Sequence, residues 1–110
     1  MSLQALEALL PDTAQASPEG HLLVGGCDLV ELADRFGTPL YVFDEATLRA
    51  RCREFLREFS SRYPDTSVLY ASKAYLNRAL AALFMEEGLG LDVVSGGELH
   101  ICLLYTSPSP

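Results

Sequence analysis

The chain has 110 residues, of which 49% are hydrophobic and 21% charged, and its formal net charge is −7. These values are typical of one small globular domain or of part of a larger one, and they argue against disorder. The acidic charge argues against nucleic acid and anionic lipid as partners, because both favour basic surfaces.

Neither a membrane segment nor a targeting segment is apparent. No apolar run approaches the ~20 residues that a membrane-spanning helix needs. Residues 1–7 (MSLQALE) lack the basic region that begins a secretory signal peptide. The three cysteines are widely spaced and form no CxxC pair, so neither a zinc site nor a disulfide framework is predicted. We therefore predict a cytoplasmic protein with no metal and no membrane partner.

The first part of the chain predicts short elements. A helix over residues 3–10 ends at Pro11, residues 11–20 read as a loop, and residues 21–24 form a short strand. Asp28 and Glu31 have the spacing of a capping box, which predicts that a helix begins at Asp28. Gly37 is expected to end that helix, because glycine tolerates the left-handed backbone of a helix C-terminus.

From residue 38 onwards, strands and helices alternate. The apolar runs predict strands over residues 40–43, 67–71 and 91–94. The intervening helices, over residues 45–62 and 78–87, would be capped by Asp44 and Asn77. A further helix opens at Ser95, with Glu98 completing a second capping box.

The helix over residues 45–62 is predicted to be amphipathic. An apolar stripe is expected to face inward and consists of Leu48, Cys52, Phe55, Leu56 and Phe59. The arginines of this helix are interpreted as a solvated polar face.

This β-α-β-α-β-α order predicts parallel strands joined by right-handed crossovers, in an α/β fold. Ligands of such folds bind at the carboxyl ends of the strands. Lys73, Asp92 and Ser95 fall at or near those ends. Lys73 is the only lysine of the chain, so any Schiff base on a side chain must form there.

Three segments occur together in a recognisable order: residues 36–44 (FGTPLYVFD), 70–74 (YASKA) and 91–99 (LDVVSGGEL). Together with residues 25–33 (GGCDLVELA), they resemble the N-terminal part of the diaminopimelate decarboxylases, which are pyridoxal-phosphate enzymes of fold type III. The resemblance covers roughly residues 20–100.

The resemblance implies the first portion of a (β/α)8 TIM-like barrel of the alanine-racemase type. It implies that Lys73 carries pyridoxal 5′-phosphate and that Asp92 and Glu98 lie near this cofactor. The implied reaction converts meso-2,6-diaminopimelate to L-lysine and CO2, in a parent enzyme that is a homodimer. Because only a neutral amine attacks a carbonyl group, we expect Lys73 to be partly buried at the barrel mouth.

The resemblance also predicts the organisation of the chain. Residues 1–37 would be a leading segment that associates with a C-terminal β domain, and residues 38–100 would begin the barrel. Residues 101–110 (ICLLYTSPSP) depart from the family and contain two prolines that cannot continue a helix. We interpret them as a non-native tail from read-through into sequencing adapter, and expect the truncated chain itself to be inactive.

Several alternatives remain open. The same fold serves decarboxylases of ornithine, arginine and carboxynorspermidine, and non-catalytic barrel relatives bind a protein partner instead. A doubly wound nucleotide-binding domain is disfavoured, because the chain lacks the glycine fingerprint GxGxxG.

Overall fold

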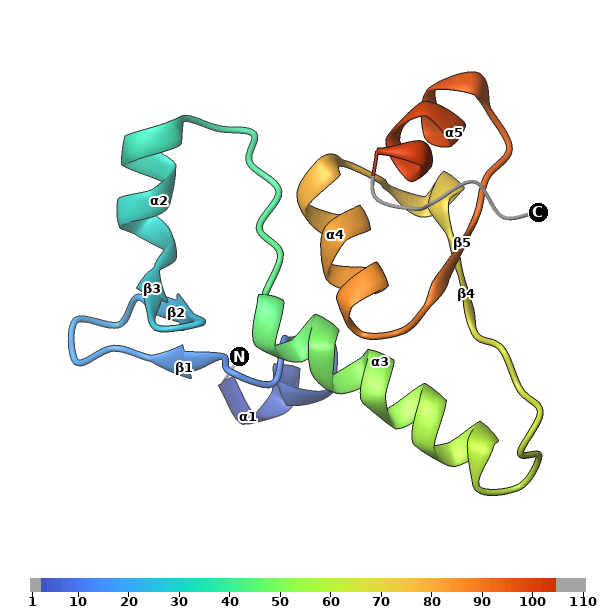
Figure 1. Ribbon diagram of the computed structural model, residues 1–110. Helices are drawn as coiled ribbons and strands as arrows, with labels where there is room; N and C mark the ends of the chain where they lie inside the picture. Colours follow the sequence, from blue (N-terminus) through green and yellow to red (C-terminus); the bar gives the residue numbers. More distant parts are fainter. Residues whose placement is uncertain (1–2, 105–110) are drawn as a thin grey trace. The chain divides into compact units, whose positions relative to one another are not determined.

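In a computed structural model of the protein, residues 3–104 are described. They fall into two compact units, Met1–Leu48 and Arg49–Pro110 (Figure 1). The first unit contains α1 (Leu3–Leu6), the 3-10 helix η1 (Glu7–Leu9), β1 (Gln15–Ala16), β2 (Leu22–Val24), β3 (Cys27–Asp28) and α2 (Leu29–Phe36). Helix α3 (Glu45–Ser60) starts in the first unit and continues into the second, which then contains β4 (Leu69–Ala71), η2 (Ser72–Ala74), α4 (Arg78–Glu86), β5 (Gly90–Asp92) and α5 (Gly96–Leu103).

Three short antiparallel strands form the sheet of the first unit. Strand β2 pairs with β1 on one side and with β3 on the other. Gly25 and Gly26 turn the chain between β2 and β3 with φ angles of 60° and 80°, which glycine adopts without steric cost. The predicted strand over residues 21–24 is confirmed. The prediction of an uninterrupted loop over residues 11–20 is wrong, because β1 lies there and pairs with β2.

Helix α2 begins and ends where the sequence predicts. The Asp28 carboxylate accepts hydrogen bonds from the backbone N–H groups of Val30 (2.8 Å) and Glu31 (3.3 Å), as an N-cap does. Gly37, with a φ angle of 83°, donates its N–H to the Ala33 carbonyl and ends the helix. No residue of α2 is fully buried.

Asp28 also pairs with a histidine, which makes this helix start sensitive to pH. His21 Nδ1 lies 2.7 Å from Asp28 Oδ2. Their hydrogen bond raises the pKa of His21 and lowers the pKa of Asp28, each relative to its ordinary value.

The pair is expected to stabilise the folded chain most between the ordinary pKa values of 3.8 for Asp28 and 6.5 for His21. Its contribution is lost as pH rises through the elevated pKa of His21, or falls through the depressed pKa of Asp28. Urea unfolding of the wild type and of His21→Gln, from about pH 5 to about pH 9, measures this difference. Equal pH dependence of the two proteins would contradict the expectation.

Asp44 caps α3 and also links it, through hydrogen bonds, to the segments around Thr13 and Gly25. Its carboxylate accepts hydrogen bonds from the hydroxyls of Thr13 (2.7 Å) and Thr47. Each threonine oxygen in turn accepts a backbone N–H, from Gly25 (2.7 Å) and from Asp12 (2.9 Å). These bonds, with the Thr47 bond first among them, lower the pKa of Asp44 despite the burial of its side chain.

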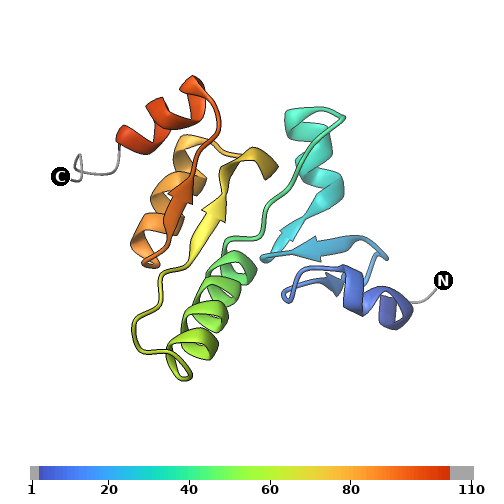
Figure 2. The same ribbon diagram turned by 90° about the vertical axis from the view of Figure 1, so that its right-hand side faces the viewer.

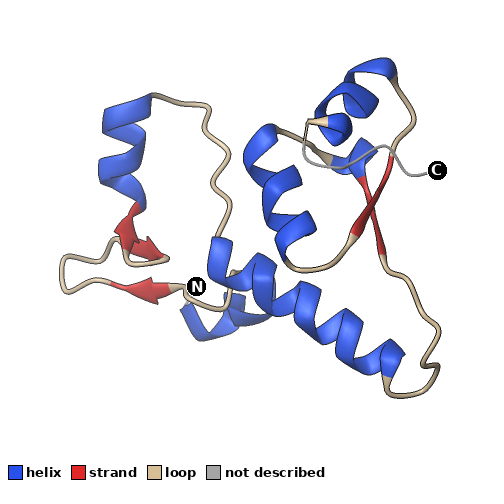
Figure 3. Cartoon of the chain, viewed as in Figure 1, coloured by secondary structure: helices blue, strands red, loops and turns tan. Residues whose placement is uncertain are grey.

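The predicted strand over residues 40–43 is not formed. This segment is loop in the structure (Figure 3). Its four side chains are exposed, with Tyr41 the most exposed at 86%. A strand needs a neighbouring strand that accepts and donates its backbone hydrogen bonds, and none of the described strands pairs with this segment. The apolar pattern therefore indicates a segment suited to strand pairing, but none of the strands within residues 3–104 pairs with it.

The second unit contains a parallel pair of strands with one helix against it. In the register of β4 and β5, Leu69 lies opposite Gly90, Tyr70 opposite Leu91 and Ala71 opposite Asp92 (Figure 2). Helix α4 contacts β5 and supplies most of the buried core, which comprises Cys52, Leu80, Ala81, Leu83, Phe84 and Leu89. The parallel pairing and the cap by Asn77, whose side chain accepts the Leu80 N–H at 2.8 Å, are both confirmed.

The predicted apolar stripe of α3 is only partly buried. Cys52 is 4% exposed, and its burial raises the pKa of its thiol. Phe55 and Phe59, in contrast, are 55% and 51% exposed and stack on one another with ring centroids 6.3 Å apart. The helical spacing was correct, but the described part of the chain has no layer that covers the two phenylalanines.

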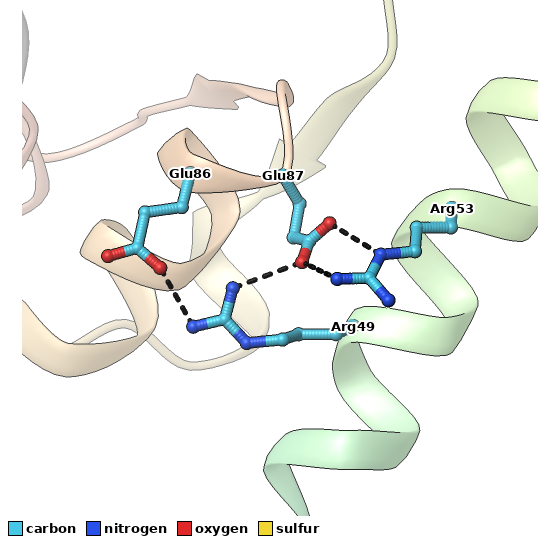
Figure 4. Close-up of polar contacts among 4 residues, drawn as sticks. All are labelled: Arg49, Arg53, Glu86 and Glu87. Atoms are coloured by element: carbon cyan, nitrogen blue, oxygen red, sulfur yellow. Dashed lines mark hydrogen bonds and ion pairs between the residues drawn. The ribbon is translucent and has the colours of Figure 1, made fainter.

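Two arginines of α3 form ion pairs with the end of α4. The Glu87 carboxylate accepts hydrogen bonds from Arg49 (3.0 Å) and from two nitrogens of Arg53 (3.0 and 2.8 Å) (Figure 4). Arg49 also bonds to Glu86 at 2.8 Å. The interpretation of a solvated face is therefore wrong for Arg49, whose side chain is 25% exposed, whereas Arg53 remains 65% exposed while it makes its ion pair. Arg62 pairs along the helix with Glu58 at 3.0 Å, and both side chains are exposed.

Glu87→Gln is expected to destabilise the second unit more than Glu86→Gln. The Glu87 side chain is 9% exposed and shares its charge between two guanidinium groups, whereas that of Glu86 is 62% exposed. Removal of one partner from a buried charge pair costs more than removal of one at the surface. The urea midpoints of the two variants, measured side by side, test this order, and a larger loss in Glu86→Gln would reverse it.

Across residues 3–104, none of the helices combines the length and the apolar character needed to cross a membrane.

Candidate functional site

The candidate site lies at the carboxyl edge of the two parallel strands. Because the strands run in the same direction, the segments that follow them leave from the same edge, η2 after β4 and the loop to α5 after β5 (Figure 2). The 3-10 turn η2 also contacts β5. Of the three residues singled out from the sequence, Lys73 and Asp92 are therefore placed at or next to this edge, and Glu98 lies in the first turn of α5, the helix that follows β5.

Lys73 is the middle residue of η2, and its side chain is exposed. Within residues 3–104 its amine makes no hydrogen bond or ion pair. The expected partial burial of Lys73 is not found, because the described residues supply only two neighbouring strands and nothing lies over the amine. An exposed, unpaired primary amine can reach a carbonyl group, so the donor chemistry at this edge fits a pyridoxal cofactor.

The sheet has one covered face and one open face. Tyr70 stacks on the buried Phe84 of α4, with ring centroids 4.0 Å apart, which marks the covered face. Side chains alternate along a strand, so Leu69 and Ala71 lie on the opposite face, and both are exposed. Asp92, paired with Ala71 and also exposed, shares this open face. Asp92 therefore lies on the strand next to β4, and β4 leads directly into the turn that contains Lys73.

Glu98 has a defined role at the start of α5. Its carboxylate accepts the hydroxyl of Ser95 (2.9 Å) and the backbone N–H of Val94 (3.2 Å). The Ser95 oxygen accepts the Glu98 N–H at 3.1 Å. The predicted capping box is confirmed, although the carboxylate reaches the N–H of Val94 rather than that of the cap residue. Each Glu98 oxygen therefore already accepts one hydrogen bond from its own helix end.

Ser72 is a residue that the sequence did not single out. It is 2% exposed, and its hydroxyl has no hydrogen-bond partner among the described residues. It lies directly before Lys73, so this short turn has one buried side and one exposed side. A buried hydroxyl without a partner has no signature in a sequence, because it depends on what packs around it.

Ser72→Ala is expected to leave the free energy of unfolding unchanged or to raise it, by up to about 1–3 kcal/mol, because it removes an unsatisfied buried hydroxyl. Urea unfolding measures the change. A loss above about 1 kcal/mol would show instead that the hydroxyl has a partner, such as a buried water.

Comparison with known proteins shows the family of the chain. The family model for the pyridoxal-binding domain of pyridoxal-dependent decarboxylases matches residues 45–109, and the chain belongs to this family. The match includes Lys73, Asp92 and Glu98.

The curated relatives with which the chain aligns include diaminopimelate decarboxylases from bacteria and archaea. It is 49% identical over 92 residues to the one of Synechocystis sp., which is 83% of this chain and 20% of the relative. It is 47% identical over 96 residues to that of Methanothermobacter thermautotrophicus, covering 87% and 22%. For Bacillus subtilis the identity is 45% over 100 residues, covering 91% and 23%. The chain thus spans about a fifth of the length of these relatives.

Residues 101–103, which the sequence analysis assigned to a non-native tail, continue α5 in the structure. Residues 105–110 of that tail lie outside the described residues.

Proposed function

We propose that this chain provides the lysine-bearing first part of a pyridoxal-phosphate-dependent diaminopimelate decarboxylase. One observation carries the proposal. The only lysine lies exposed and unpaired at the carboxyl edge of a parallel strand pair, within the segment that matches the pyridoxal-binding family. In this role Lys73 holds the cofactor covalently through its amine.

The neighbouring residues would orient the cofactor and tune its charge. Asp92, on the open face of β5, is placed to offer a carboxylate to a positively charged group of the ligand. Glu98 would contribute through the acceptor sites that its two capping bonds leave on the carboxylate. Pyridoxal phosphate, when bound, supplies the electron sink that accepts the electron pair left as the substrate carboxylate departs as CO2.

The proposed fold is a (β/α)8 barrel of fold type III, of which residues 38–100 form the beginning. Residues 1–37 would be the leading segment, and the exposed apolar residues 40–43 would pair with a strand that the described residues do not include. A barrel of this type needs about 250 residues, so the other phosphate and substrate contacts must come from elsewhere. The working enzyme is proposed to be a homodimer that acts on a small amino acid.

Diaminopimelate is the preferred substrate, because the relatives named above carry that name at 45–49% identity. Ornithine and arginine decarboxylases share the fold and are the alternatives. The test is CO2 release by the full-length protein, expressed from the source DNA, with meso-diaminopimelate, ornithine and arginine supplied separately. Release from diaminopimelate alone is expected, and release from ornithine or arginine in its place would overturn the substrate assignment.

A further inference from the structure

Tyr70 of β4 is held at both ends of its side chain. Its ring stacks on Phe84 of α4 with a centroid separation of 4.0 Å and an interplanar angle of 26°. Its hydroxyl donates a hydrogen bond to the backbone carbonyl of Tyr75 at 2.7 Å. Phe84 is 4% exposed, so the Tyr70 ring packs against the buried core of this unit. Burial also raises the pKa of Tyr70, which keeps the hydroxyl protonated as a donor.

This hydrogen bond closes a loop around Lys73. The chain from Tyr70 to Tyr75 includes the whole of η2, and Lys73 lies in its middle. The turn is only three residues long, and its N-cap, Ala71, makes no side-chain hydrogen bond. On its buried side the Ser72 hydroxyl also lacks a partner. The Tyr70 hydroxyl is therefore a side-chain group that ties the end of the turn to the core.

We propose that Tyr70 is a positioning residue for Lys73, in that it fixes the backbone from which the amine reaches the cofactor. The inference rests on the proposed function of Lys73. A lysine side chain has four rotatable carbon bonds, so a mobile backbone would add to the freedom that is lost when the amine reacts. Fixing the backbone that carries a reactive group lowers this entropic cost, and small displacements of such a group have large effects on the reaction rate.

The test uses Tyr70→Phe, which keeps the ring and its stacking and removes only the hydroxyl. Tyr63→Phe is the matched control, because Tyr63 is 70% exposed. The 110-residue chain, acetylated at its N-terminus to block the α-amine, is titrated with pyridoxal phosphate. The adduct is reduced with borohydride and quantified by mass spectrometry, with N-acetyl-lysine amide as reference. Urea unfolding confirms that the proteins compared are folded.

Tyr70→Phe is expected to weaken adduct formation by about two- to tenfold, the range of a single hydrogen bond, whereas Tyr63→Phe leaves it unchanged. The amides of Lys73 and Ala74 should also exchange hydrogen faster in Tyr70→Phe alone. A structural role without positioning would lower only the urea midpoint.

Equal adduct formation and equal amide exchange in the wild type and Tyr70→Phe would overturn the inference and leave the role of Lys73 intact. If the wild type reacted no better than N-acetyl-lysine amide, the turn would not prepare the lysine, and the positioning role would be overturned. The cofactor role would stand, because it is tested separately by CO2 release from the full-length protein.

Discussion

Lys73→Ala is expected to abolish the side-chain adduct with pyridoxal phosphate. The chain contains no other lysine, so no second side chain can replace the lost amine. The measurement is peptide mapping after borohydride reduction, in which the added mass should be found on the peptide that contains Lys73 in the wild type and be absent from the variant. Mapping is needed because the α-amine of Met1 can also react.

Lys73→Arg is the matched control for charge. Arginine keeps the positive charge at this exposed position, and its guanidinium group stays protonated and does not form the adduct. Both variants should therefore lose the adduct, while their urea midpoints stay close to that of the wild type because the side chain is exposed and unpaired. If Lys73→Arg retained the mass addition at this peptide, the assignment of the reactive amine would be wrong.

Phe84→Ala is expected to lower the free energy of unfolding of the second unit by about 3–5 kcal/mol, the usual cost of removing a buried phenylalanine. Phe84 is 4% exposed and lies between the helix core and the ring of Tyr70. Domains of this kind have a total stability of about 5–15 kcal/mol, so the change removes a large part of it. Equilibrium unfolding in urea, followed by circular dichroism, measures the loss.

Two variants separate the causes of that loss. Phe84→Leu keeps most of the buried volume and should lose chiefly the ring stacking, which is worth about 0.5–1.5 kcal/mol. Phe55→Ala removes a phenylalanine that is 55% exposed and should cost less than about 1 kcal/mol. A loss in Phe55→Ala as large as in Phe84→Ala would contradict the burial of these two side chains.

The elements predicted from local signals are those that the structure confirms. Asp28, Asn77 and Ser95 each cap a helix at the predicted residue, because a cap involves only the next three residues of the chain. The parallel pairing of β4 and β5 followed from the helix between them, since a crossover of that length permits no hairpin.

The predictions that failed depended on partners distant in sequence. Residues 40–43 have the composition of a strand and lack a neighbour, and Phe55 has the correct helical spacing and lacks a covering layer. Strand β3 was missed because its two residues, Cys27 and Asp28, were assigned to the approach to α2. The Gly25–Gly26 pair between apolar residues was the available signal for a hairpin.

At the candidate site, the sequence indicated which residues lie at the strand ends but not their surroundings. Lys73, in the turn directly after β4, and Asp92, at the end of β5, follow adjacent strands as the spacing of one helix and one strand predicts. Their roles, and that of Glu98, remain predictions. The anchoring of Tyr70 on Phe84 and Tyr75 depends on how α4 packs against the sheet, and no local pattern reports that packing.

The capping bonds of Glu98 affect what it costs a ligand to reorient that carboxylate. The carboxylate already accepts one backbone and one side-chain hydrogen bond at the start of α5. A helix cap is worth about 0.5–2 kcal/mol, so a ligand that turns the carboxylate away from both partners loses that amount. Converted at about 1.4 kcal/mol per factor of ten, this loss weakens binding by about two- to thirtyfold relative to a carboxylate that caps no helix. The carboxylate of Asp92 is exposed and lies at the end of a strand, where it caps no helix. A ligand can therefore reorient it at a smaller cost in free energy than the carboxylate of Glu98.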